Sequence, residues 1–221
     1  KASNAIEKKQ YVVESNTVTI KAGERVAKFR MKGIYENIDK TDSLSVTFNL
    51  LAKDENVWDL YGTRTRVQMQ KACPFELSTF EGYCLLTSSF FSAYMTNTEH
   101  RLLQAERDKT EDNTIILHDF FYKNYDLKIK YDPSDPLKPF VEFDDQIIGS
   151  TAEAFGTIYG NGKLMCTQPV AYDSYYNVCQ KFVFLYSTIY VVGKGTVGTY
   201  VNILEWISDE EAEQYKKEEG L

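Results

Sequence analysis

The sequence predicts an all-β chain in which a small antiparallel β-sandwich precedes a larger antiparallel meander, closed or partly open as a β-barrel. Short segments alternate between apolar and polar residues, which is the period of a half-buried strand. The chain holds 16 tyrosines and 13 phenylalanines, and aromatic side chains favour strands. Turn residues separate the segments, and 221 residues suit one large or two small domains of about 100–200 residues each.

The first domain is expected at residues 11–72, after a polar tether at residues 1–10. Segments 16–20, 26–32, 44–50 and 65–69 alternate and are expected to be strands. Polar residues at every second position are typical of antiparallel sheets with one solvated face. Such strands, broken by turns, indicate a sandwich.

The pair Cys73-Pro74 interrupts this pattern, because proline cannot donate to a sheet ladder. We therefore expect the β-barrel-like domain at residues 73–207. The charged tail at 208–221 is expected either to form a short helix or to fray. The strands of the second domain are expected at residues 80–86, 90–96, 102–104, 114–120, 126–131, 140–143, 154–159, 163–166, 181–192 and 196–206. A second sandwich is the alternative to a barrel.

The charge of the chain argues against nucleic acid as a partner. The net charge is −7, whereas phosphate binding needs concentrated lysine and arginine. Up to residue 72 there are 13 basic and 9 acidic residues, and from residue 73 there are 12 and 23, which gives +4 and −11. No apolar run approaches the roughly 20 residues of a membrane helix.

Motifs for catalysis or metal binding are missing from the sequence. His100 and His118 are the only histidines, and no nucleophile, zinc or phosphate-loop motif occurs. We expect a protein that is not an enzyme and has no cofactor. Asp132 and Asp135 are a weak calcium candidate, but their spacing matches no calcium loop and a plain turn is favoured.

Four cysteines allow three complete pairings. Cys166 and Cys179 flank one loop, so they are the favoured bridge if a disulfide forms. Cys84 lies in an apolar segment and could equally be a small buried side chain.

The best binding candidate is the loop 167–178, which gathers Tyr172, Tyr175 and Tyr176. Tyrosine offers a flat apolar face with a polar tip and recurs in recognition surfaces. Alternatively, the three rings fold back and fill the end of the barrel. Trp58 and Tyr61 form a second, weaker candidate in the first domain.

Two stretches carry a resemblance to a known group of proteins. The stretch TVTIKAGERVAKFRMKGIYENIDKTDSLSVTFNLL resembles the immunoglobulin-like or Calx-β-like N-terminal modules of uncharacterised surface lipoproteins from gut Bacteroidetes. CPFELSTFEGYC, with a meander ending GTYVNILEWI, is similar to their C-terminal β domains. The resemblance implies an immunoglobulin-like sandwich at residues 11–72, export, a lipidated cysteine upstream of Lys1 and anchoring at the outer membrane, so that the lipid would be the only link to the membrane. It carries no catalytic residues.

Taken together, these features predict a monomeric, non-catalytic, exported surface lipoprotein that binds a glycan or a protein partner. The alternative is a lipocalin-like carrier, with a small apolar ligand held inside the barrel by residues such as Phe91, Ile129 and Phe184. A third hypothesis is a glycoside-acting enzyme using acids such as Glu142, Asp144 and Asp145.

Overall fold

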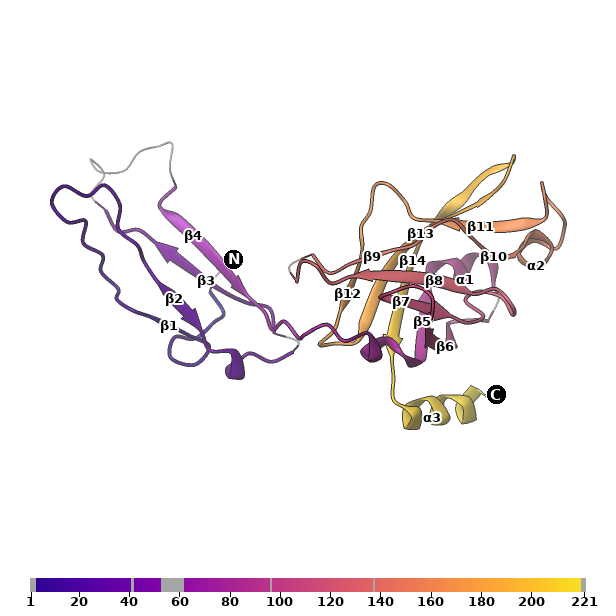
Figure 1. Ribbon diagram of the computed structural model, residues 1–221, viewed down its shortest axis with the longest axis horizontal. Coiled ribbons are helices and arrows are strands. Elements are labelled where there is room, and N and C mark those ends of the chain that lie inside the picture. Colours follow the sequence, from indigo (N-terminus) through magenta and orange to yellow (C-terminus); the bar gives the residue numbers. More distant parts are fainter. Residues whose placement is uncertain (1–2, 41, 53–61, 96, 137, 220–221) are drawn as a thin grey trace. The chain divides into compact units, whose positions relative to one another are not determined.

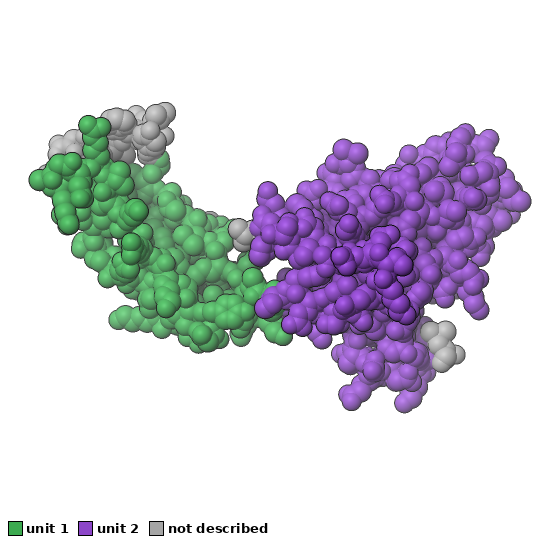
Figure 2. All heavy atoms as spheres, in the orientation of Figure 1, with its two compact units in different colours: residues 1–73 green, residues 74–221 purple. Residues whose placement is uncertain are grey.

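A computed structural model describes residues 3–40, 42–52, 62–95, 97–136 and 138–219. The chain divides into two compact units, Lys1–Cys73 and Pro74–Leu221 (Figures 1 and 2). This division falls one residue after the expected domain boundary. Because proline at position 74 cannot take part as a donor in a strand, the chain leaves the first unit here without continuing its sheet.

The first unit contains two separate pairs of antiparallel strands. Strand β1 (Tyr11–Val13) pairs with β2 (Met31–Gly33), and β3 (Leu44–Asn49) pairs with β4 (Arg64–Met69). A short 3-10 turn, η1 (Tyr35–Asn37), follows β2. Within the described residues the unit therefore falls short of the seven strands of an immunoglobulin-like sandwich.

Several expectations for this unit are wrong. Of the expected strand at 26–32, only Met31 and Lys32 lie in a strand, β2. Residues 16–20 form no strand, and Val18 and Ile20 are exposed, because the Ser15 hydroxyl accepts a hydrogen bond from the Thr17 amide and turns the backbone locally. Residues 3–10, the described part of the expected tether, are also no free tether. The side-chain oxygen of Asn4 accepts a 2.5 Å hydrogen bond from the Ser45 amide, which fixes this segment to β3.

The second unit contains a closed barrel of eight antiparallel strands, as the sequence predicts (Figure 1). Neighbours around the barrel follow the order β5-β6-β7-β8-β9-β12-β13-β14, and β14 closes the ring by pairing with β5. The strands are β5 (Gly82–Ser88), β6 (His100–Arg107), β7 (Thr114–Leu117), β8 (Leu127–Asp132), β9 (Phe140–Glu142), β12 (Ser174–Asn177), β13 (Phe182–Val191) and β14 (Gly195–Trp206).

Two further strands extend the sheet from β13. Strand β10 (Gln146–Ser150) pairs with β11 (Lys163–Thr167), and β11 pairs with the second half of β13 at Thr188–Tyr190. The first half of β13 pairs with β12 instead. One long strand thus belongs to the barrel at one end and to the extension at the other.

Short helices replace two of the expected strands. Residues 89–94 form α1 (Ser89–Tyr94), because the Ser88 hydroxyl accepts a hydrogen bond from the Phe90 amide and caps the helix. Residues 151–155 form α2 (Thr151–Phe155), which starts with a reciprocal capping box between Ser150 and Glu153. The expectation of strands at 90–96 and 154–159 is therefore wrong.

The tail forms a helix, α3 (Asp209–Glu219), one of the two outcomes expected. The Ser208 hydroxyl accepts a hydrogen bond from the Glu211 amide, and the Glu211 carboxylate accepts one from the Ser208 amide at 2.8 Å. The Lys216 ammonium donates to the Tyr83 hydroxyl at 2.9 Å, which holds the helix against β5.

Aromatic side chains fill the barrel interior. The Phe80 ring, at the end of the 3-10 turn η3 (Leu77–Phe80), lies 4.6 Å from the Tyr131 ring and 5.1 Å from the Trp206 ring. Phe91 and Ile129 are buried in this packed core. Phe184 is not, because it alternates with the buried Val183 and Leu185 and therefore faces outward.

Candidate functional site

The outer face of β12 and β13 carries a row of aromatic side chains. The run FVFLYSTIYV of β13 alternates strictly, with buried residues between half-buried ones. This alternation places Phe182, Phe184 and Tyr186 on the outer face, while Tyr172 and Tyr175 come from the segment before and within β12. We call this set the aromatic strip: Tyr172, Tyr175, Phe182, Phe184 and Tyr186.

The rings of the aromatic strip are stacked in pairs. The Tyr172 and Tyr186 rings lie 5.0 Å apart at an interplanar angle of 21°. The Tyr175 and Phe184 rings lie 5.4 Å apart at 10°. A further contact of 5.3 Å joins Phe184 to Tyr186 and links the two pairs. The packed rings hold one another in place, so little ordering is left for binding.

Two of the three tyrosines singled out in the sequence lie on this surface. Tyr172 is 52% exposed and Tyr175 is 39% exposed, whereas Tyr176 is only 4% exposed. The prediction of Tyr176 as a binding residue is wrong, because residues 174–177 form β12 and not a loop. In a strand Tyr176 must face opposite to Tyr175, and its hydroxyl donates to the Asp132 carbonyl at 3.2 Å.

The expected bridge between Cys166 and Cys179 does not form. Cys166 is a free thiol on the inward face of β11, and burial raises its pKa to about 12. Cys84 is likewise a free buried thiol. Cys73 and Cys179 are disulfide-bonded. The sequence favoured Cys166 and Cys179 because they flank one loop, but strand alternation turns Cys166 into the core.

The aromatic strip continues across β9 into a polar region. Tyr175 on β12 lies directly opposite Phe140 on β9, which in turn lies opposite Asp132 on β8. Two residues further along the same face of β9, Glu142 lies opposite Lys130. The aromatic rings and the charged side chains therefore share one outer face of the barrel.

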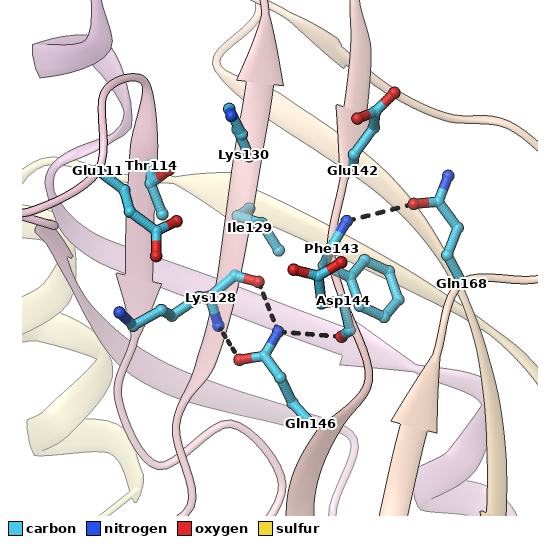
Figure 3. Close-up of a pocket in the computed structure, with 10 residues that line it drawn as sticks. All are labelled: Glu111, Thr114, Lys128, Ile129, Lys130, Glu142, Phe143, Asp144, Gln146 and Gln168. Atoms are coloured by element: carbon cyan, nitrogen blue, oxygen red, sulfur yellow. Dashed lines mark hydrogen bonds between the residues drawn. The ribbon is translucent and has the colours of Figure 1, made fainter.

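A pocket of about 500 Å³ opens at this polar region, and we call it the polar pocket (Figure 3). Figure 3 shows its side chains converging from β8, β9 and the segments that follow β9 and β11. Its lining residues are Glu111, Thr114, Lys128, Ile129, Lys130, Glu142, Phe143, Asp144, Gln146 and Gln168.

The Gln146 side chain closes one side of the polar pocket, because its amide bonds both backbone groups of Lys128 as a neighbouring strand would. Its carbonyl oxygen accepts a 2.9 Å hydrogen bond from the Lys128 amide, and its amide nitrogen donates at 2.8 Å to the Lys128 carbonyl (Figure 3). The same nitrogen reaches the Asp144 carbonyl at 3.4 Å. Gln146 is thereby fixed, and its amide has little capacity left for a ligand.

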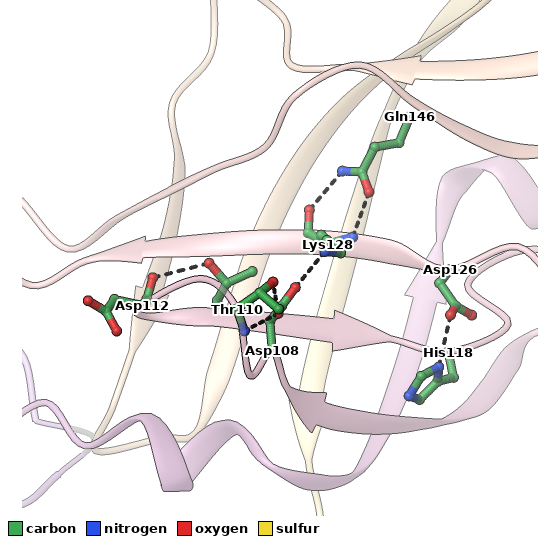
Figure 4. A network of polar contacts seen from close by, with 8 residues as sticks. Asp108, Thr110, Asp112, His118, Asp126, Lys128 and Gln146 are labelled. Carbon is green, nitrogen blue, oxygen red and sulfur yellow. Dashed lines mark hydrogen bonds and ion pairs between the residues drawn. The ribbon is translucent and has the colours of Figure 1, made fainter.

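Lys128 forms an ion pair with Asp108, the residue that follows β6 (Figure 4). Its ammonium lies 2.5 Å from the carboxylate of Asp108, a side chain that is almost fully buried. Hydrogen bonds from Lys128 and Thr110 hold the pKa of the Asp108 carboxyl far below its usual range. The hydrogen bond to Asp108 in turn raises the pKa of Lys128. Among the described lining residues, Lys130 is the cation without a paired carboxylate, and Lys128 is also attracted by Glu111, so carboxylates outnumber cations around the pocket.

The calcium candidate has a local structural role. Asp132 accepts a 3.0 Å hydrogen bond from the Ser134 amide, and hydrogen bonds from Ser134 lower its pKa. This is the plain turn that the sequence favoured. Across the residues that the structure describes, no group of three or more His, Cys, Asp or Glu side chains, Asp135 included, is placed to hold a metal ion.

The two histidines lie in ordinary surface contacts. His118 Nδ1 lies 3.0 Å from the Asp126 carboxylate (Figure 4), and His100 Nδ1 lies 2.7 Å from the Thr87 hydroxyl. Trp58 and Tyr61, the second binding candidate, lie outside the described residues.

Sequence reasoning missed Phe182, Phe184 and Tyr186 as surface residues. The signal was present in the strict alternation of the run 182–191, where Val183, Leu185 and Ile189 mark the inner face. The sequence left open which of the two alternating sets faces the interior, because residues 182, 184 and 186 are about as apolar as residues 183, 185 and 189.

None of the helices in the described part of the chain has the length and the apolar content to cross a bilayer. In comparisons with known proteins, the family described as "Domain of unknown function (DUF4984)" matches residues 60–218. No curated protein matches the chain, and no solved structure matches it.

Proposed function

The chain belongs to the DUF4984 family, a domain of unknown function, and we propose that it is a non-catalytic binding module that holds a glycan on its aromatic strip. The single observation that carries this proposal is the exposed, pairwise-stacked row of rings on β12 and β13. The flat apolar face of a sugar ring stacks on such rings, while tyrosine hydroxyls offer hydrogen bonds to its edge.

Two features of the strip support a binding role over a structural one. Tyr172 and Tyr175 are exposed although the barrel interior already buries a large aromatic core. Contiguous apolar surface of this kind usually marks an interaction site. Beside the strip lies a polar pocket that could satisfy hydroxyl groups.

We also propose that the protein is exported as an outer-membrane lipoprotein of the kind found in gut Bacteroidetes. The sequence resemblance described above is the basis of this proposal. The disulfide-bonded state of Cys73 and Cys179 supports it, because disulfides persist mainly in oxidising compartments.

A protein partner is the second candidate for the same surface. Val170, next to the strip in sequence, is fully exposed, and tyrosine and phenylalanine are enriched in protein interfaces. The carrier alternative has less support, since rings 4.4 to 5.6 Å apart, such as Phe120–Phe121 and Phe91–Phe121, fill the interior.

A glycan array tests the proposal. The wild-type protein would be compared with the double variant Tyr172→Ala/Tyr175→Ala and with Tyr159→Ala, a matched exposed tyrosine away from the strip. We expect the double variant to lose at least tenfold in apparent affinity and the control to bind like the wild type. Glycan binding that survives in the double variant would remove the strip from the proposal. If the wild type binds no glycan on the array, a protein partner would be favoured.

A further inference from the structure

We infer that the polar pocket is the subsite for a neutral sugar unit of the bound glycan, and that it discriminates against acidic sugars. This inference rests on the proposed function, because it requires a glycan on the aromatic strip. It adds a second contact region and a ligand class that the strip alone does not define.

The placement of the pocket makes a shared ligand possible. Tyr175 and Phe140 lie opposite one another on neighbouring strands, which are about 4.8 Å apart. Glu142 lies two residues beyond Phe140 on the same face, about 7 Å along the strand. A short oligosaccharide stacked on Tyr175 can therefore extend over Phe140 into the pocket.

The pocket offers the hydrogen-bonding groups that sugar hydroxyls require. The carboxylates of Glu142 and Asp144 are exposed and can accept hydrogen bonds from hydroxyl groups. The Gln168 side-chain oxygen accepts a hydrogen bond from the Phe143 amide at 3.2 Å, which orients the side chain. Within the described residues the Gln168 amide nitrogen has no partner, so it can donate to a ligand oxygen.

The charge balance of the pocket selects against anions. Among the described residues, Lys128 and Lys130 face four carboxylates, those of Asp108, Glu111, Glu142 and Asp144, so the region keeps a net negative charge. A uronic acid or a sulfated sugar would bring a further negative charge close to these carboxylates, and like charges at this range repel. A neutral hexose meets no such penalty.

The experiment uses matched pairs of probes: cellotetraose, laminaritetraose, mannotetraose and chitotetraose, and for the first three the same chain with its terminal unit oxidised to the uronic acid. Binding would be measured for the wild type, for Glu142→Gln/Asp144→Asn, for Gln168→Ala and for Tyr175→Ala. Glu76→Gln, an exposed acid outside the pocket, is the control for a change of charge.

We expect the wild type to bind a neutral chain at least tenfold more tightly than its oxidised form. Glu142→Gln/Asp144→Asn should reduce this preference to less than threefold, and Gln168→Ala should weaken neutral binding about fivefold. Tyr175→Ala should weaken neutral and oxidised chains by the same factor, because stacking does not depend on charge. The control should leave all affinities unchanged.

The outcomes separate the two proposals. If Tyr175→Ala abolishes binding while both pocket variants bind like the wild type, the strip is a glycan site and the pocket inference is wrong. Equal affinity of the wild type for neutral and oxidised chains also overturns the inference. If no tetrasaccharide binds, this inference fails, and the proposed function fails as well when the wild type also binds nothing on the glycan array. Amide shifts of Phe143 and Gln168 on adding the neutral chain to the wild type provide a readout that needs no variant, and their absence despite binding would overturn the inference.

Discussion

At the scale of single residues, Asn202 stands out as a fully buried polar side chain in the barrel wall. Its oxygen accepts a 2.7 Å hydrogen bond from the Ser88 hydroxyl, and its nitrogen donates to the Ser187 hydroxyl at 2.9 Å and to the Leu185 carbonyl at 3.0 Å. One amide thus joins β5, β13 and β14, and it satisfies groups that water cannot reach.

Replacing this amide should be costly. We expect Asn202→Ala to lower the free energy of unfolding by about 3 kcal/mol, because it removes one hydrogen-bond partner from each of the buried Ser88 and Ser187 hydroxyls and leaves a small void. Urea denaturation followed by circular dichroism measures the change. The exposed substitution Gln104→Ala should stay within about 0.5 kcal/mol, and a loss below about 1 kcal/mol for Asn202→Ala would contradict the network.

The lowered pKa of Asp108 implies that the stability of the fold depends on pH. Its pKa in the folded protein lies below the usual value of about 3.9, so its contribution to stability is complete above that pH and is lost as the pH falls toward the folded pKa. We expect Asp108→Asn to lower the urea midpoint at pH 7. The difference from the wild type should shrink between about pH 4 and pH 2.

The exposed substitution Asp173→Asn serves as the control for this pH series. Its urea midpoints should follow those of the wild type at every pH. A difference between Asp108→Asn and the wild type that stays constant down to pH 2 would exclude the pair with Lys128 as its cause.

At the scale of elements, capping decides where strands give way to helices. Ser150 with Glu153 and Ser208 with Glu211 both form the S-x-x-E pattern, and both start a helix. The sequence contained the S-x-x-E signal of α2, whereas α1 is capped by the Ser88 hydroxyl without a partner glutamate, and the aromatic content of residues 90–96 and 154–159 favoured strands. Local hydrogen bonds to orphan helix amides outweighed a weak strand preference in both places.

The cap of α3 can be tested alone. Ser208→Ala should destabilise the helix by about 1 kcal/mol, which corresponds to roughly fivefold faster hydrogen exchange of its amides. The barrel amides should keep their protection, because α3 lies outside the ring of strands. Ser78→Ala, an exposed serine in η3, is the matched control, and unchanged exchange in α3 would show that packing against Tyr83 alone holds the helix.

The same scale explains how much of the candidate site could be predicted. Tyr172 and Tyr175 were found from the clustering of tyrosines in the polar segment 167–178. The burial of Tyr176 could not be predicted in the same way. It depends on the pairing of residues 174–177 with β9 and β13, and the pairing with β9 joins segments that are more than 30 residues apart. The polar pocket depends on the register that brings Glu142 opposite Lys130, and no local pattern fixes that register.

At the scale of the whole molecule, the all-β class followed from alternating and β-branched or aromatic runs, and the barrel followed from the number of strands expected in meander order after residue 80. The arrangement of the first unit did not, because its alternating segments 16–20 and 26–32 are polar enough to remain solvated. The cysteine pairing also failed, since proximity in sequence carries little information about a barrel whose neighbours are distant in the chain.

The interior of the barrel depends on one central ring. Phe80 is fully buried and contacts Tyr131, Tyr176 and Trp206, which come from three different strands. We expect Phe80→Ala to cost about 3–5 kcal/mol, because the cavity cannot collapse without moving those strands.

Chemical denaturation followed by tryptophan fluorescence measures this loss. Phe184→Ala removes the same ring from the half-buried outer face, and it should cost no more than about 1.5 kcal/mol. Equal losses for the two variants would mean that the interior is not the main source of stability in this unit.

Closure of the ring has a consequence for synthesis of the protein. Strand β14 pairs with β5 through Trp206–Cys84 and Asn202–Ser88, so the first strand of the barrel waits for the last one to leave the ribosome. Until then β5 carries an open edge of unpaired amides and carbonyls, which is the type of surface that pairs with other chains. A nascent chain that stalls before residue 202 should therefore be a substrate for chaperones or for aggregation, whereas the completed chain conceals that edge.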